Sequence, residues 1–120
     1  MSLPLTPEGI AAVYECLRAF PPFSKWKLPP SDEVEFQVAL DNTVHGWYVY
    51  DTKTKRHSIS ISKNGVSQFG TLAMITAHEM IHLHQVLKKT ASSKTHHNGD
   101  FRRIAGQVCK CFGWDKGVFV

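Results

Sequence analysis

At 120 residues, with 42% of them hydrophobic and 20% charged, the chain suits one folded domain, which we expect to span residues 1–120. This composition excludes a disordered chain, which has fewer apolar side chains and more charge. The formal net charge of +4 permits contact with DNA but supports it only weakly, because the basic residues form no clustered stripe of the kind that a dedicated nucleic-acid binder carries.

The first predicted element is a helix from Pro7 to about Phe20. Thr6 is a suitable N-cap before a proline in the first turn. Apolar side chains then repeat at helical spacing, at Ile10, Val13, Tyr14, Leu17 and Phe20. The following segment, residues 21–30, combines four prolines with Phe23, Trp26 and Leu28. We expect it to be an ordered loop that lies against the core.

Three strands are predicted next. Residues 34–40 alternate, with Val34, Phe36, Val38 and Leu40 on one face. Residues 46–51 are rich in aromatic and β-branched side chains, and residues 56–62 alternate again. Turn signals at Asp41-Asn42 and Asn64-Gly65 separate these runs from their neighbours. Since the connections between the strands are short, we predict a three-stranded antiparallel meander.

Two further helices complete the predicted fold. Residues 70–90 are apolar around most of a helical circumference, which is typical of a central, largely buried helix. Residues 90–98 are polar and predict a loop. The last helix ends near Gly113 and carries Phe101, Ile104, Ala105, Val108 and Phe112. The predicted class is therefore α+β: an N-terminal helix, an antiparallel meander, a central helix and a C-terminal helix.

The central predicted helix contains the sequence His-Glu-Met-Ile-His at residues 78–82. Residues four apart share one helical face, so His78 and His82 can offer two imidazole nitrogens to one zinc ion. Glu79 lies about 100° around the helix from His78, which leaves its carboxylate able to reach a water molecule on the metal. We therefore predict one catalytic Zn²⁺ with Glu79 as general base. Packing alone is a poorer explanation, because these polar side chains are costly to bury without partners.

Catalytic zinc usually has three protein ligands and one open position, so a third ligand is needed. His84 lies about 200° around the helix from His82, and we interpret it as a packed or surface side chain. His45 and His57 fall in the strand region and are interpreted as structural. The remaining candidates, His96 and His97, precede the last predicted helix, and either can reach the ion.

The sequence His78-Glu79-Met80-Ile81-His82, followed after an intermediate loop by His97-Asn98-Gly99-Asp100-Phe101, resembles the SprT-like metallopeptidase core that is also found in the Spartan protease. The resemblance implies a zincin-like minimal core whose second element reads His-Gly-x-x-Phe and supplies the third zinc ligand. His97 and Phe101 have the required separation, so the resemblance selects His97 and leaves His96 as the alternative. Asn98 stands where the family usually has glycine.

The motif and the resemblance together predict a zinc-dependent metalloendopeptidase that acts on a protein or peptide substrate. The alternative function is a non-catalytic module, stabilised by zinc, that binds DNA or a protein partner; a closed four-ligand site would favour it. We also expect the strand at residues 56–62 to form a sheet edge that an extended substrate can pair with. The oxyanion-stabilising residue is left open among Tyr48, Tyr50, His96 and Arg102.

Two other expectations concern supporting residues and compartment. Asn98 and Asp100 are interpreted mainly as caps of the last helix, with support of His97 as the alternative.

Cys16, Cys109 and Cys111 form an odd set that predicts reduced thiols rather than a disulfide framework. No apolar run approaches the ~20 residues of a membrane span, and no signal peptide is recognisable. We therefore expect a cytoplasmic protein without a membrane partner.

Overall fold

The computed structural model describes residues 5–40, 45–63, 69–91 and 97–119. It confirms the α+β class. In chain order the elements are α1 (Pro7–Arg18), η1 (Phe23–Lys25), η2 (Ser31–Glu33), β1 (Val34–Ala39), β2 (Gly46–Asp51), β3 (Arg56–Ser62), α2 (Phe69–Lys88), α3 (Gly99–Phe112) and α4 (Lys116–Phe119). Within these ranges, no helix is both long enough and apolar enough to cross a membrane.

Helix α1 begins as predicted and ends two residues earlier. The Thr6 side chain accepts a hydrogen bond from the backbone N–H of Gly9 at 2.9 Å, which caps the helix. Phe20, the last residue of the predicted helical repeat, lies beyond the helix end and is 52% exposed. The cause is Pro21, because proline disfavours helical backbone at the residue before it. The other apolar side chains of the repeat are buried: Ile10, Val13, Tyr14 and Leu17.

The proline-containing segment at residues 21–30 is ordered and packs on the helices, as predicted. Phe23 and Leu28 are buried. The Tyr14 hydroxyl donates a 2.6 Å hydrogen bond to the carbonyl of Pro29. Trp26 stacks on His84 of α2, with ring centroids 4.0 Å apart. This segment therefore closes the core between α1 and α2.

The sheet differs from the prediction, because it is mixed rather than an antiparallel meander. Its strand order is β1-β3-β2, so β3 lies in the middle. Strands β2 and β3 form the predicted antiparallel hairpin, with Tyr48 opposite Ile59. Strand β1 instead pairs in parallel with β3, and Phe36 is also opposite Ile59. The predicted turn residues Asp41, Asn42, Asn64 and Gly65 lie outside the described residues.

The burial of β3 explains its central place. Ile59 and Ile61 are fully buried on the face toward the helices, and Ser60 and Ser62, on the opposite face, are also at most 2% exposed. Strands β1 and β2 flank β3 on its two edges, which agrees with this burial. The edge strands are more exposed, and β1 ends at Ala39, one residue before the prediction, which leaves Leu40 79% exposed.

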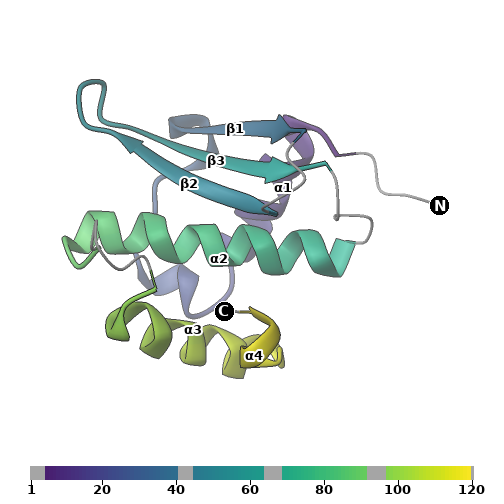
Figure 1. Ribbon diagram of the computed structural model, residues 1–120, viewed down its shortest axis with the longest axis vertical. Helices are drawn as coiled ribbons and strands as arrows, with labels where there is room; N and C mark the ends of the chain where they lie inside the picture. The colour runs from purple at the N-terminus through teal and green to yellow at the C-terminus, as the bar shows by residue number, and fades with distance from the viewer. Residues whose placement is uncertain (1–4, 41–44, 64–68, 92–96, 120) are drawn as a thin grey trace.

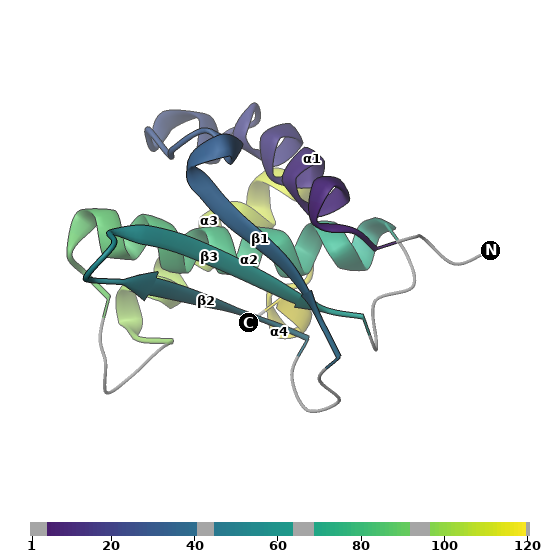
Figure 2. The ribbon, with the colours of Figure 1, turned by 90° about the horizontal axis from the view of Figure 1, so that it is seen from above.

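Helix α2 is the central element of the fold. Figure 1 shows it between the sheet on one side and α3 with α4 on the other, and Figure 2 shows α1 beside β1, over the same face of the sheet as α2. It packs against α1, β2, β3, α3 and α4. Such contact on all sides requires apolar side chains around the helix, as its sequence predicts. Residues of α2 therefore face both the sheet and α3, and the region between α3 and the sheet contains the candidate site.

Candidate metal centre

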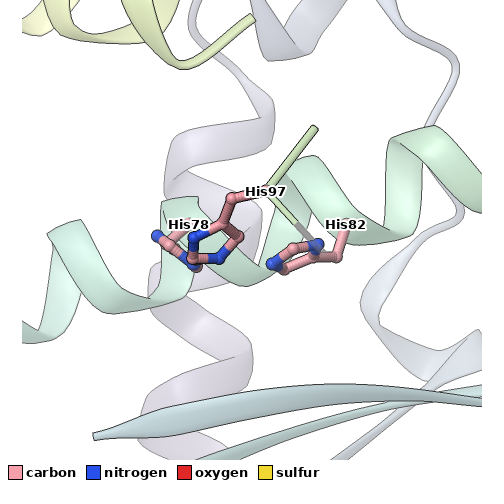
Figure 3. Close-up of side chains that lie close together, drawn as sticks. All are labelled: His78, His82 and His97. Atoms are coloured by element: carbon pink, nitrogen blue, oxygen red, sulfur yellow. The ribbon is translucent and has the colours of Figure 1, made fainter. Parts of the chain in front are cut away.

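Three histidines from two parts of the chain come together at α2. His78 and His82 lie one turn apart on α2, and His97 lies two residues before α3. Figure 3 shows their imidazole rings gathered beside the helix. One ring nitrogen from each histidine lies within 4.8 Å of the corresponding nitrogens of the other two, and each side chain is half-buried. The Nε2 atoms of His78 and His97 are 3.1 Å apart. This group can hold one metal ion.

Phe101 packs against all three imidazoles. Its ring centroid lies 4.4 Å from that of His97, 4.6 Å from that of His82 and 5.0 Å from that of His78. The rings of His97 and His82 are stacked on it. Phe101 itself is fully buried in the first turn of α3. Because a buried aromatic ring cannot rotate freely, it restricts the orientations of the imidazoles above it.

The orientation of His78 is fixed by a backbone group. Its Nδ1 lies 3.0 Å from the carbonyl oxygen of Phe119 in α4. A carbonyl oxygen can only accept, so Nδ1 carries the proton and the neutral ring has an unprotonated Nε2. That Nε2 is the atom that faces His97. Metal-binding histidines characteristically donate their second ring N–H to such an acceptor.

Burial controls the protonation of the site. It lowers the pKa of His78; the nearby His97 lowers it further, and the Phe119 carbonyl opposes these effects. A neutral imidazole is the form that binds metal. Burial raises the pKa of Glu79 to about 8, because the side chain is 4% exposed and desolvation disfavours its charged form. Three imidazoles, without a thiolate, are a donor set that suits zinc.

The SprT-like family model matches residues 13–118. The chain belongs to the SprT-like family. No curated protein matches it. The matched region includes the three histidines, Glu79 and Phe101, whereas Phe119 lies one residue beyond it.

The other histidines of this SprT-like protein that the structure describes lie in separate environments. His84 is buried against Trp26, and its pKa is lowered to about 4, chiefly by burial. His57 is buried in β3 and shares a hydrogen bond with the Tyr48 hydroxyl. His45 is exposed. None of these three histidines belongs to the group formed by His78, His82 and His97. His96, the alternative third ligand, lies outside the described residues.

The supporting residues near His97 are partly as predicted. Asn98 caps α3, because its Oδ1 accepts a 2.9 Å hydrogen bond from the backbone N–H of Phe101. Arg102, a candidate for oxyanion stabilisation, donates from Nε to the backbone carbonyl of His97 at 3.2 Å. It therefore supports the main chain of the loop that contains His97.

Two contributors to the site were missed by sequence reasoning. The Phe119 carbonyl has no sequence signal, since it is a main-chain atom 41 residues from its partner. Gln85 did have a signal, because it is a polar residue on a helix predicted to be buried. It is 1% exposed and hydrogen-bonds to Asn98 and Asp100, on either side of the start of α3.

Proposed function

We propose that this SprT-like protein is a zinc-dependent metallopeptidase, with His78, His82 and His97 as ligands of one zinc ion. The observation that carries the proposal is the convergence of these three imidazoles, which come from two elements, on a volume that fits one ion. Membership of the SprT-like family supports it. We further propose that residues 1–120 act as a single domain.

In this proposal Glu79 is the general base. Bound zinc would supply Lewis-acid activation of water, lowering its pKa to about 7. Glu79 follows His78 directly on α2, and its buried carboxyl group has a pKa near 8. A carboxyl with a pKa near neutrality can both accept a proton and return it to a leaving amine. A cation at the three histidines would favour its ionised form.

The number of available ligands favours catalysis over a purely structural ion. Within the described ranges, the group of potential metal-binding side chains comprises three histidines. Structural zinc is usually enclosed by four protein ligands, whereas catalytic zinc has three and an open position. This count supports the peptidase over the non-catalytic module that binds DNA or a protein partner.

The substrate we propose is an extended polypeptide that pairs with β2. The expected edge at residues 56–62 was wrong, because β3 is the middle strand and both of its sides are already paired. Strand β2 is an edge strand and packs on α2. An extended peptide can add to such an edge through main-chain hydrogen bonds. A peptide complex in which the bound chain makes no main-chain pairs with β2 would contradict this assignment.

The three cysteines indicate the cellular compartment that we propose for the protein. Cys16, Cys109 and Cys111 are all free thiols, and Cys16 and Cys111 are exposed. Exposed thiols that form no disulfide suit a reducing environment. We propose that the enzyme acts in the cytoplasm.

The deciding experiment measures zinc content and cleavage of an unfolded protein for four proteins: the parent, Glu79→Gln, His78→Ala and, as a matched control, His45→Ala. Glu79→Gln should keep zinc and lose about 10²-fold or more of its activity, the scale expected for a general base. His78→Ala should lose both, and His45→Ala neither. Cleavage by Glu79→Gln at the parent rate would refute the mechanism. A zinc-loaded parent that cleaves nothing, with or without single-stranded DNA, would favour the binding module.

A further inference from the structure

Gln85 is a buried polar residue that connects α2 to the segment containing His97. It lies three residues after His82, and its side chain is 1% exposed. Its amide nitrogen, Nε2, donates to Asn98 Oδ1 at 3.0 Å and to Asp100 Oδ2 at 3.1 Å. Both protons of the amide are therefore used. A single side chain of the central helix thus binds the residue after His97 and the first turn of α3.

The two acceptors are themselves held by further hydrogen bonds. Thr90 donates from Oγ1 to Asp100 Oδ2 at 2.8 Å. Asn98 donates from Nδ2 to the backbone carbonyl of Thr90 at 3.0 Å. The backbone N–H of Thr90 in turn donates to the carbonyl of Gln85 at 2.9 Å. Gln85, Thr90, Asn98 and Asp100 therefore form a connected polar network, which we call the Gln85 network.

The Gln85 network determines where His97 lies relative to α2. Asn98 directly follows His97, and its Oδ1 accepts from both Gln85 and the backbone of Phe101. Gln85 and His82 lie on the same helix, which is rigid over one turn. A bond from Gln85 to Asn98 therefore fixes His97 against His82 and His78.

We propose that Gln85 is a positioning residue of the metal centre, whose buried amide holds the segment at His97 in the geometry needed to complete the three-histidine group. This inference rests on the proposed metal-binding function. Packing alone does not account for Gln85, since an apolar side chain fills a buried position without the desolvation cost of an amide. Burial of an amide is favourable only when its partners are in place.

The test is zinc affinity, measured on the purified chain by competition with a chromophoric chelator. Gln85→Met retains the length of the side chain and removes its hydrogen bonds. Gln107→Met makes the same change at an exposed position of α3 and is the matched control. We expect Gln85→Met to lower zinc affinity by about 10- to 100-fold, the range for residues that orient metal ligands. Gln107→Met should stay within about twofold of the parent.

A double-mutant cycle with His97→Ala separates positioning from general stability. If Gln85 acts through His97, Gln85→Met should change zinc affinity by less than about twofold once His97 is already alanine. If it lowers affinity by the same factor in both backgrounds, it acts through general stability, and the proposal is overturned. The proposal is also overturned if Gln85→Met binds zinc as tightly as the parent when His97 is present.

Two further results need an interpretation: failure of Gln85→Met to fold, and unchanged zinc affinity of His97→Ala. Should Gln85→Met not fold, Thr90→Val takes its place, because it removes the Thr90–Asp100 hydrogen bond at a half-buried position and retains the side-chain shape. Thr90→Val should lower zinc affinity by a smaller factor than Gln85→Met does. Unchanged affinity would overturn the proposal. If His97→Ala binds zinc as tightly as the parent, the ligand assignment itself fails, a result that differs from a failure of Gln85 alone.

Discussion

The carbonyl oxygen of Phe119 lies 3.0 Å from Nδ1 of His78 and joins the end of the described chain to the candidate metal centre. The carbonyl is held there by a defined turn. Gly113 has a left-handed backbone, with φ of 74°, which ends α3. The Asp115 side chain then accepts from the backbone N–H of Gly117, and the backbone N–H of Phe119 donates to the carbonyl of Asp115. Helix α4 therefore presents a main-chain acceptor to a histidine of α2.

The first prediction concerns the tautomer of His78. In the metal-free protein, neutral His78 should carry its proton on Nδ1 and none on Nε2, because its partner at Nδ1 can only accept. Long-range proton–nitrogen NMR distinguishes the two ring nitrogens directly. Exposed His45 is the internal control and should show signals averaged over both tautomers. Protonation of His78 at Nε2 would contradict the assigned role of Phe119.

The second prediction tests the close approach of β2 to α2. A methyl group on Gly46 would lie 2.8 Å from Cγ2 of Ile75 and 3.0 Å from the backbone oxygen of Ser60. Gly46→Ala should therefore lower the free energy of unfolding by about 1–3 kcal/mol, as overpacking does. Ile75 lies one turn before His78, so the same change should disturb the helix face beside the site.

Gly106→Ala is the matched control for Gly46→Ala. Gly106 lies inside α3, and the nearest atom to an added methyl group is Nζ of Lys116, at 3.5 Å. Alanine favours a helix over glycine, so this change should raise the free energy of unfolding by about 0.5–1 kcal/mol. Urea unfolding of the metal-free proteins measures both. A Gly46→Ala protein at least as stable as the parent would show that β2 and α2 are not in close contact at Gly46.

Local signals predicted the helices better than the sheet. Thr6 and Pro7 mark the start of α1, because capping depends on neighbouring residues alone. Strand order depends on pairing between segments that are distant in the sequence. Ser60 and Ser62, the polar members of the alternating run at residues 56–62, are both buried. The meander was predicted from the short connections between the strands, and connection length does not reveal that β3 lies between β1 and β2.

In the candidate site, too, features set by neighbouring residues were predictable from the sequence and features set by distant residues were not. The spacing of His78 and His82 follows from the geometry of one helix and was predictable from the residues alone. His97 required a known family pattern, because a loop of unknown path separates it from the helix. Gln85 could have been found as a buried amide that needs partners. The role of the Phe119 carbonyl could not have been found from the sequence, because every residue has the same main-chain group.

The third prediction concerns Asp100 and stability at low pH. Burial acts to raise the pKa of its carboxyl group, but hydrogen bonds from Arg103, Gln85 and Thr90 outweigh this effect and hold the pKa well below its usual range. The folded state therefore favours the carboxylate. The Asp100 carboxylate contributes its full stabilisation above about pH 3.9, the pKa of aspartate in an unfolded chain. This contribution is lost as the pH falls from there toward the lower pKa that Asp100 has in the folded protein.

Asp100→Asn tests this contribution in metal-free protein, so that loss of metal does not interfere. At pH 7 the variant should be less stable than the parent by about 1.5–3 kcal/mol, the range for hydrogen bonds to a charged group. The difference should shrink as the pH falls below about 4, because the Asp100 carboxyl takes up its proton first in the unfolded state and the folded state then loses its advantage. Asp32→Asn, at an exposed position, is the control for loss of a surface charge. A difference that is constant with pH would exclude ionisation as its cause.

The last prediction concerns zinc and thermal stability. A ligand that binds only the folded state stabilises it by about 2.7 kcal/mol at a free concentration 100 times its dissociation constant. For a domain of this size, roughly 4 °C of melting temperature corresponds to each kcal/mol, so zinc should raise the Tm by about 10 °C. Excess chelator should reverse the shift. His97→Ala should abolish most of it, whereas His45→Ala should retain it, because His45 is exposed and is not a member of the three-histidine group. A zinc-induced shift that survives His97→Ala unchanged would place the ion elsewhere in the protein.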